Sequence, residues 1–549
     1  MMESGKGGPR RVAGRCARWF GICLRVTPVA VMIALGGCAA VGPDFEKPDA
    51  PQQPEWQKVG EKGLNSETVD YRDWWRIFGD PELDRLIQLA YDRNPTLQVA
   101  GLRVIGARAQ LGIAVGNLYP QQQQAFGSYA YQGISENAVP VNNLPPAVAN
   151  GVDTTFSNWV LGAGASWELD FWGKFRRNIE SANANFVSTL ADYDNVIVLL
   201  TGDVASAYAL MRTFEARLTI ARRNVEIQRR SLNITEVRFR NGATTELDVR
   251  QAESLLYETE ALIPQLETGL AQSRNALATL LGMPPGEMGS ILAGQSGVIP
   301  SPPATVAVGV PADLLRRRPD IRGAELQAAT QSALIGVAKA DLYPSLGLVG
   351  NIGFQASDAA DLFKGASLVG VISPGFKWNI LNYGRITNNV RVQDARFQQL
   401  VSNYQNTVLQ AYQEVENAMV GFLNSQEEAE TLSKSVKASE RSVELALIQY
   451  RDGVADYTRV LNTQTFLARV QDQMTATRGN VATNLIAMYT ALGGGWQVRE
   501  GKPVVPESIM KTMSERTDWG KLLPADTPGE PLDPPKPAGQ QSVIQRPTW

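Results

Sequence analysis

The sequence contains one set of landmarks twice, at a constant spacing of 211 residues. The landmarks are Trp167 and Trp378, Gly173 and Gly384, Gly242 and Gly453, and the pairs Leu281-Gly282 and Leu492-Gly493. Upstream, the tripeptide LYP occurs at 118–120 and at 342–344, 224 residues apart. Constant spacing over several landmarks indicates a tandem duplication with equal elements in equal order. The first half has 13 more residues between LYP and its tryptophan, which predicts an insertion in one loop.

Each half also contains a long tract without proline, between Pro146 and Pro264 and between Pro374 and Pro503. An interior proline costs a helix roughly 3 kcal/mol, so such tracts favour long helices. The two glycine landmarks within each tract lie 69 residues apart, which is about 100 Å of α-helix. The second tract shows the alternating spacings of three and four of a coiled-coil seam, at Val401, Tyr404, Val408, Ala411, Val415, Ala418 and Phe422.

A turn-forming pair ends each long tract, Asn241-Gly242 in the first half and Asp452-Gly453 in the second. Glycine after an asparagine or aspartate is typical of a helix end followed by a tight turn. Each pair is therefore expected at the tip of a helical hairpin. The returning helices are expected at about 245–282 and 457–493.

The segments between LYP and the landmark tryptophans alternate with period two, which is typical of strands. In NWVLGAGASWELD (158–170), one face carries Trp159, Leu161, Ala163, Ala165, Trp167 and Leu169. SLGLVGNIGFQ (345–355) repeats the pattern with Leu346, Leu348, Ile352 and Phe354. This is the pattern of a transmembrane barrel, although a soluble sandwich also alternates. Each half is thus predicted to be helix, two strands, long helix, turn, helix.

Four strands per chain cannot close a barrel, so several chains would have to share one. Two chains would supply eight strands, whose interior side chains nearly fill the barrel, whereas three would supply twelve and leave a conduit. No segment after the N-terminal region has 18 consecutive apolar residues, so no transmembrane helix is expected. A chain that crosses a membrane without such helices does so as a β-barrel.

All three cysteines, Cys16, Cys23 and Cys38, lie near the N-terminus. Residues 1–37 combine a basic region, the short apolar stretch VTPVAVMIAL (26–35) and small residues before Cys38. This stretch resembles a bacterial lipoprotein signal with its lipobox, which implies acylation of Cys38 as the first mature residue. An ordinary signal peptide cut nearby is the alternative. Ala39 follows the cysteine, and by resemblance to known sorting rules this favours the outer membrane over the inner one.

Composition narrows the possible functions. The chain has 52 basic and 55 acidic residues, a net charge of −3, which argues against a nucleic-acid partner. Histidine is absent, so the commonest general base and metal ligand is missing, and no thiolate metal site is possible after Cys38. We therefore expect no cofactor or metal, and catalysis is disfavoured but not excluded, because some enzymes use carboxylates alone. Glu168 and Asp170, on one face of a predicted strand, are the candidate for an enzyme, and charges at a barrel rim explain them equally well.

Beyond the signal peptide (1–37), the expected domains follow from the proline distribution and the repeat. They are an acylated, Pro-rich leader at 38–70, a first repeat at 71–290, a linker at 291–313, a second repeat at 314–500 and a Pro-rich, disordered tail at 501–549.

Several motifs together resemble the TolC-like outer-membrane efflux proteins, specifically the NodT-type lipoprotein subgroup. They are GPDFEKP (42–48), DWWRIFGDPELDRLI (73–87), ELDFWGKFRR (168–177), RRRPDIRGAE (316–325), ADLYPS (340–345), NYGR (382–385) and LGGGW (492–496). The resemblance covers about residues 38–500. It implies an α+β membrane protein that is a homotrimer, with a 12-stranded β-barrel in the outer membrane continuous with a 12-helix periplasmic α-barrel. Each chain would supply four strands and two long coiled-coil hairpins.

The same resemblance implies a lipid-anchored location in the outer membrane and a passive, gated duct that extends into the periplasm. The implied partners are outer-membrane lipid, a periplasmic adaptor and an inner-membrane pump, commonly of the resistance-nodulation-division class, which supplies the energy. The duct would export small solutes or drugs. A type I secretion duct for polypeptides is one alternative, and a periplasmic coiled-coil lipoprotein without a pore is another, although the latter leaves the alternating strands unexplained.

The gate of such a duct is expected at the hairpin tips. Family members often carry acidic residues there in a segment like LDAQ, which here is Leu461-Asn462-Thr463-Gln464. Charges that remain near the tips are Asp452, Asp456 and Arg459 in the second hairpin and Asp248 in the first. Arg459 occupies the repeat position of Asp248, so the two tips would present opposite charges to each other. Ordinary solvated turn residues are the alternative interpretation.

Overall fold

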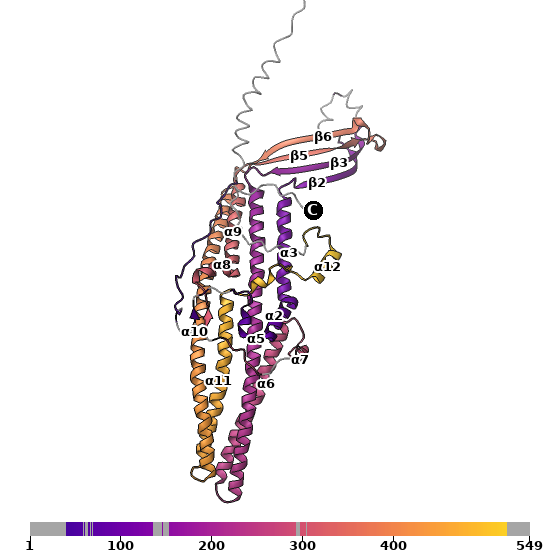
Figure 1. Ribbon diagram of the computed structural model, residues 1–549. Coiled ribbons are helices and arrows are strands. Elements are labelled where there is room, and N and C mark those ends of the chain that lie inside the picture. Colours follow the sequence, from indigo (N-terminus) through magenta and orange to yellow (C-terminus); the bar gives the residue numbers. More distant parts are fainter. Residues whose placement is uncertain are drawn as a thin grey trace, which may run out of the picture.

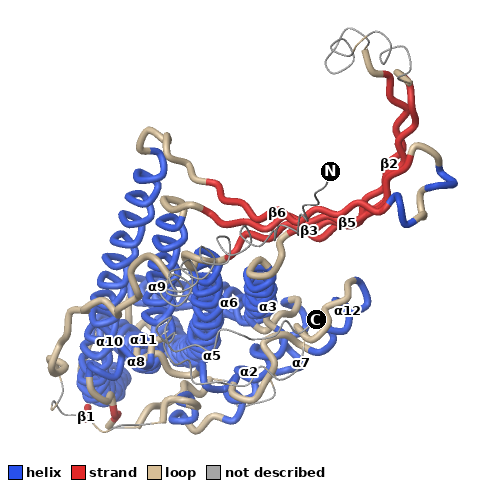
Figure 2. Tube along the Cα trace, turned by 90° about the horizontal axis from the view of Figure 1, so that it is seen from above, coloured by secondary structure: helices blue, strands red, loops and turns tan. Residues whose placement is uncertain are grey.

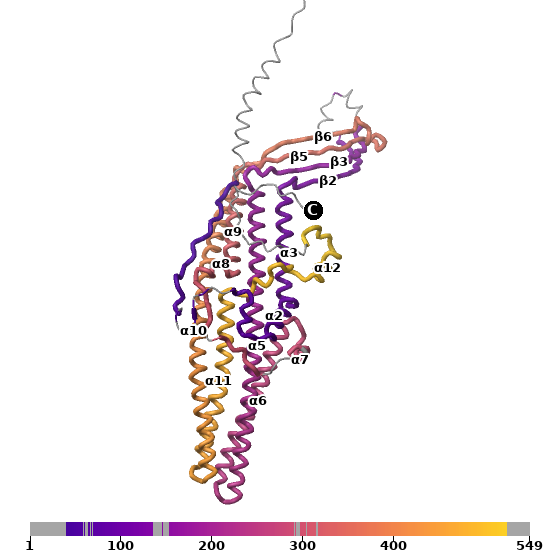
Figure 3. Tube along the Cα trace, in the orientation of Figure 1, coloured from indigo at the N-terminus to yellow at the C-terminus, as the bar shows by residue number. Residues whose placement is uncertain are grey.

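Helices dominate the structure, and each half of the chain forms one very long helical hairpin. The computed structural model describes residues 40–523 except 59, 61–63, 66, 68–69, 136–144, 146–152, 293–296 and 304. The sheet lies at one end of an elongated molecule and the hairpin tips at the other (Figures 1 and 3). The first repeat consists of α2 (Pro81–Arg93), α3 (Pro95–Gly116), β2 (Gln122–Gly133), β3 (Thr155–Leu169), α5 (Lys174–Arg240) and α6 (Glu246–Leu280). The second consists of α9 (Pro319–Ala340), β5 (Ser345–Ala356), β6 (Leu368–Lys377), α10 (Arg385–Arg451) and α11 (Tyr457–Ala491).

The predicted helical hairpins are confirmed. α5 and α10 are each 67 residues long, and α6 and α11 are each 35. The predicted seam of α10 is buried from Tyr404 to Phe422, while Val401 at its start is half-buried. By length and composition alone, α3 and α5 would each be able to cross a membrane. In α5, 61 % of the apolar stretch is buried inside the molecule, so packing against neighbouring helices accounts for it.

The repeated Leu-Gly landmarks mark a contact that the two halves share. The Asn94 side chain, which precedes α3, donates to the carbonyl of Leu280 at the end of α6 (2.9 Å). Arg318, which precedes α9, donates to the carbonyl of Ala491 at the end of α11 (2.8 Å). The last carbonyls of a helix lack intrahelical partners, so both residues satisfy groups that would otherwise be orphaned. Each half therefore ties the end of its returning helix to the start of its short helix.

The four longer strands form one antiparallel sheet in the order β2-β3-β5-β6. Leu161 lies opposite Phe354 and Trp167 opposite Leu348, so the predicted apolar faces of β3 and β5 are on the same side. In Figure 2 the sheet extends away from the helices as a curved arm. Ile372 is accordingly 80 % exposed, although it lies in the middle of β6. The outer edges of β2 and β6 have no strand partner within the described part of the chain.

A buried ionic network joins α2, α5 and α6. Arg212, 3 % exposed, donates to Glu82 (2.5 Å) and to Glu215 (2.8 Å). Glu215, 5 % exposed, also accepts from Arg274 (2.8 Å) and from the amide of Gly297 (2.9 Å). Burial by itself raises the pKa of Glu215, but these hydrogen bonds outweigh it, so the pKa of Glu215 lies below its ordinary value.

The expected disorder of the tail is wrong for residues 501–523. They include α12 (Glu507–Arg516), which lies beside α3 in Figure 1. Val505 and Met513 are buried there against Ile105 of α3. The prolines of the tail dominated the sequence argument, but the apolar residues between them supply enough surface to dock on α3. The structure also adds a short parallel pair, β1 (Leu64–Asn65) with β4 (Val306–Ala307), and the one-turn helices α7 (Met288–Ile291) and α8 (Leu314–Arg317).

The leader runs along the outside of the helices, from the base of the sheet downwards (Figure 3). The amide of Val41 donates to the carbonyl of Trp172 (3.0 Å), where β3 meets α5. Arg177, 2 % exposed, pairs with Asp44 (2.7 Å). Lower down, the Trp56 indole donates to the carbonyl of Gly309 (3.2 Å). The leader thus connects the sheet end of the molecule to its middle, while Cys38 lies outside the described residues.

Candidate functional site

Both hairpin tips have the same backbone geometry. Gly242 and Gly453 adopt φ of 70° and 77°, in the left-handed region that glycine enters without steric cost. The next amide donates back into the helix in each case, from Ala243 to Arg238 and from Val454 to Gln449, both at 2.8 Å. This is the glycine helix end that the sequence predicts, in both repeats.

The charges that the sequence singles out are bonded within their own hairpins. The Asp456 carboxylate accepts from the amide of Arg459 (3.3 Å) and so caps the first turn of α11. The Arg459 guanidinium donates to the side chain of Gln449 (3.2 Å), on the opposite arm of the same hairpin. In the first hairpin, the Thr244 hydroxyl donates to Asp248. Within one chain, therefore, Arg459 and Asp248 do not pair with each other.

Asp452 and Asn462 lie at the surface of the second tip. Asp452 directly follows α10 as its C-cap residue, and its amide donates to the carbonyl of Ile448 (2.9 Å). Asn462 occupies the second turn of α11 and is exposed. Both side chains are exposed, and the Asp452 carboxylate lies 3.9 Å from the Arg451 guanidinium.

Arg238, which the sequence argument missed, joins the two hairpins. Its guanidinium, near the end of α5, donates to the carbonyls of Tyr450 (2.5 Å) and Arg451 (2.9 Å) at the end of α10. The guanidinium also lies 4.7 Å from the centre of the Tyr450 ring. A cation at the C-terminus of a helix is favourable because the last carbonyls carry partial negative charge. The sequence contains one indication that Arg238 differs from its counterpart in the second half, because the uncharged Gln449 stands at its repeat position.

Aromatic packing reinforces this link. Tyr450 and Tyr457 are buried and meet edge to face, with ring centres 5.4 Å apart. They belong to a small cluster with Ala252 of α6. The hydroxyl of Tyr457 lies 3.5 Å from that of Ser231 in α5. The tips of the two hairpins are therefore held together by Arg238 and by the packing of this tyrosine pair of the second hairpin against Ala252 and Ser231 of the first.

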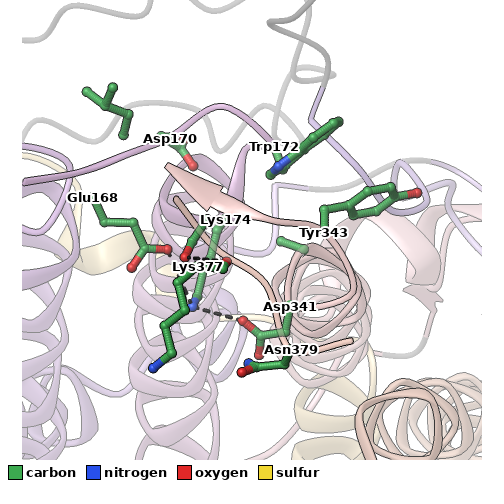
Figure 4. Close-up of a pocket in the computed structure, with 11 residues that line it drawn as sticks. Glu168, Asp170, Trp172, Lys174, Asp341, Tyr343, Lys377 and Asn379 are labelled. Carbon is green, nitrogen blue, oxygen red and sulfur yellow. Dashed lines mark hydrogen bonds and ion pairs between the residues drawn. The ribbon is translucent and has the colours of Figure 1, made fainter. Parts of the chain in front are cut away.

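A second group of charges surrounds the junction of sheet and helices. There, a cavity of about 200 Å³ is lined by Glu168, Asp170, Lys174, Asp341 and Tyr343, among others (Figure 4). Lys174 pairs with Asp341 (2.9 Å) and lies 3.9 Å from Glu168. Burial disfavours the charged lysine, but the bond to Asp341 and the other carboxylates outweigh it and raise the pKa of Lys174.

Asp170 and Glu168, the candidate carboxylates for an enzyme, both contact residues at the start of α5. Asp170 accepts from the amides of Phe175 (2.9 Å) and Arg176 (3.0 Å), and from the Arg176 side chain (3.0 Å). It therefore caps the start of α5, while Glu168 faces Lys174. These contacts support the interpretation of both residues as rim charges.

Comparison with known proteins agrees with this geometry. The family model for outer membrane efflux proteins matches residues 86–283 and 310–494. The pyoverdine export outer membrane protein OpmQ of Pseudomonas putida is 31 % identical over 424 residues, which cover 77 % of this chain and 88 % of OpmQ. The probable outer membrane lipoprotein SilC of Salmonella typhimurium is 28 % identical over 478 residues, covering 86 % of this chain and 99 % of SilC.

The fold has close counterparts among solved structures. The outer-membrane channel OprN superposes with a TM-score of 0.77 at 29 % identity, covering 83 % of this chain and 99 % of the OprN chain. Sequence, fold and arrangement of strands and hairpins thus lead to one assignment. The chain belongs to the outer membrane efflux protein family and has the fold of a TolC-like outer-membrane channel.

Proposed function

We propose that three copies of this chain form the outer-membrane duct of a tripartite efflux system. The observation that carries the proposal is the four-stranded sheet, which has an apolar face, direct continuity with 67-residue helices and, among the residues that the structure describes, two edges without a strand partner. Unpaired strand edges are not tolerated in hydrocarbon, so the edges of β2 and β6 need strand partners. Three copies supply twelve strands, enough to leave an aqueous lumen.

In this proposal the duct is passive. A periplasmic adaptor binds the helical hairpins, and an inner-membrane pump of the resistance-nodulation-division class supplies the energy. The solutes are small molecules rather than polypeptides. The name of OpmQ, a pyoverdine export protein, supports a small-solute duct over the type I secretion alternative.

The gate is proposed at the hairpin tips, where Asp248, Asp452, Asp456, Arg459 and Asn462 lie. Three-fold repetition converts each exposed tip charge into a ring, and charged rings select among ions. Arg238 is added to the gate because it links the first hairpin to the second.

Acylation of Cys38 is proposed as a second attachment to the membrane. The position of the leader supports it, because an atom added at Gly173 would meet Ala40 at 2.5 Å, so the first described residue of the leader lies against the base of the sheet. A lipid on Cys38, two residues earlier, would lie close to the bilayer surface. The lipoprotein name of SilC points the same way.

The experiment is reconstitution of the purified protein in planar bilayers, together with electrophoresis of unheated samples to detect trimers. We expect trimers that conduct ions. The variant Cys38→Ser, exported with a non-lipoprotein signal, should still form trimers in the outer membrane, because the closed barrel satisfies its own backbone. Trimers without conductance would refute the duct. Loss of trimers only in the Cys38→Ser variant would show that the barrel alone is an insufficient anchor.

A further inference from the structure

An aromatic contact joins the two repeats of one chain where the sheet meets the helices. The indole of Trp172, which follows β3, donates to the carbonyl of Pro344 (2.8 Å). Its ring stacks on Tyr343, with ring centres 4.6 Å apart and planes 24° from parallel. Tyr343 and Pro344 belong to the second LYP motif. Trp172 of the first repeat thereby contacts the LYP motif of the second repeat at the junction of sheet and helices (Figure 4).

The duplication defines an equivalent pair of groups that one chain cannot bring together. The spacing of 211 places Tyr383 at the position of Trp172, and the spacing of 224 places Tyr119 and Pro120 at the positions of Tyr343 and Pro344. Trp172 follows β3 and faces the next strand, β5. Tyr383 instead follows β6, the last strand, whereas the first LYP motif precedes β2 at the other edge of the sheet. Tyr383 and the first LYP motif therefore lie at opposite edges of one chain's sheet.

Two structural observations support this equivalence. The Trp167 indole donates to the carbonyl of Leu118 in the first LYP motif (3.1 Å), and the Trp378 indole donates to Leu342 in the second (3.0 Å). Hence each LYP motif sits in the same way against the strand of its own repeat. In addition, the residue after Trp172 and the residue after Tyr383 are both glycines at positive φ, 76° and 80°, that precede a long helix.

Tyr383 combines high exposure with an unfavourable backbone conformation, as expected for a residue that packs against another chain. It is 98 % exposed, although it is a large aromatic residue in the connection between β6 and α10. Among the residues that the structure describes, it is the one non-glycine residue at positive φ, 48°. That conformation costs a side-chain-bearing residue about 1–2 kcal/mol, and it persists where surrounding contacts hold it.

We propose that Tyr383 of one protomer packs on Tyr119 of the next and donates its hydroxyl to the carbonyl of Pro120 there. This contact rests on the trimer of the proposed function. The Pro120 carbonyl already accepts from the Gln123 side chain (3.3 Å), and its second lone pair remains for the tyrosine hydroxyl. Three contacts of the Trp172 type within chains then alternate with three of the Tyr383 type between chains.

The charges around the two kinds of contact differ. Within a chain, Lys174 lies between Asp341 and Glu168. At the repeat positions of these three residues stand Arg385, Asn117 and Asn379. An ion pair thus supports the aromatic contact inside each chain, whereas amides replace the carboxylates between chains. We therefore expect the contact between chains to depend on the Tyr383 ring, with little contribution from ion pairing.

The test is thiol cross-linking in a Cys38→Ser chain exported with a non-lipoprotein signal, which leaves no other mature cysteine. The double variant Tyr383→Cys with Tyr119→Cys is treated with a short bis-maleimide in assembled trimers. We expect denatured bands at two and three times the chain mass. The matched control, Trp172→Cys with Tyr343→Cys, should cross-link within one chain and give the monomer band with a joined peptide pair.

Trimers in which the control reacts within the chain, but the Tyr383 pair does not join chains, would overturn the contact and leave the duct intact. Absence of trimers in the unsubstituted chain would overturn both. A second measurement needs no cysteines: the temperature at which trimers dissociate during electrophoresis. Tyr383→Trp should keep that temperature, because tryptophan fills the equivalent position, and Tyr383→Ala should lower it. An unchanged temperature for Tyr383→Ala would also refute the proposal.

Discussion

Replacement of Arg238 by alanine should favour the open state of the proposed gate. Arg238 is half-buried and donates to two carbonyls at the end of α10, while its guanidinium covers the Tyr450 ring. Any opening that separates the two hairpins of a chain must break this contact. The substitution removes it from the closed state and leaves the open state unchanged, so the equilibrium moves towards opening.

The magnitude follows from the contacts. A hydrogen bond from a charged donor contributes about 1.5–3 kcal/mol when buried. Solvent screening reduces this for a half-exposed arginine, so we take about 1 kcal/mol per chain. Three equivalent contacts in a trimer give about 3 kcal/mol, and each 1.4 kcal/mol is a factor of about ten. Opening that breaks all three contacts should therefore become about a hundredfold more frequent, and opening that breaks only one about fivefold.

The assay is single-channel recording in planar bilayers, after electrophoresis has shown that the variant still forms trimers. Arg240→Ala is the matched control, because Arg240 is exposed at the same end of α5 and its loss changes the net charge equally. Arg238→Lys should be intermediate, since lysine keeps the charge but lacks the planar fork that reaches two carbonyls. If Arg238→Ala and Arg240→Ala open equally often, charge and not the link between hairpins controls the gate.

Further substitutions test the tips and the core. Asp456→Asn should keep the cap of α11 and change only the cation preference of the pore, whereas Asp456→Ala should also lower stability by about 1 kcal/mol; equal melting temperatures would contradict a capping role. Gly453→Ala should cost about 1 kcal/mol because only the positive φ opposes it, whereas Gly493→Ala should cost more in the same melting assay because its new methyl would also lie 2.9 Å from Arg318. Glu215→Gln should destabilise the protein by about 3 kcal/mol at neutral pH, because it removes one of the two carboxylates that pair with the buried Arg212 and the carboxylate that the exposed Arg274 contacts. The folded pKa of Glu215 is below its ordinary value of about 4.3, so its stabilisation is present above that value and lost as the pH falls through the folded pKa. Urea titrations at pH 7 and at successively lower pH should show the difference between the variant and the unsubstituted protein begin to shrink below about pH 4.3 and shrink further as the pH falls through the folded pKa; a difference that stays constant down to about pH 2 would contradict the assignment.

The sequence by itself determined the elements and their order. The hairpins follow from helical periodicity, from proline-free tracts and from the turn pairs at Gly242 and Gly453, all of which are local properties. The strands follow from alternation with period two, and the pairing of β3 with β5 in the structure places their predicted apolar faces on the same side. The duplication added the equivalence of the two halves, because equal spacing implies equal elements.

Only the tertiary structure decided which side chains act across elements. Asp456 is a helix cap and Arg459 contacts its own hairpin, while Arg238, an unremarked arginine in the sequence, reaches the carbonyl of a residue 212 positions away. The docking of α12 on α3 likewise depends on surfaces that are far apart in the chain. Such contacts leave no periodic signal, because they arise where long elements pack against each other and each partner is set by the position of the whole helix.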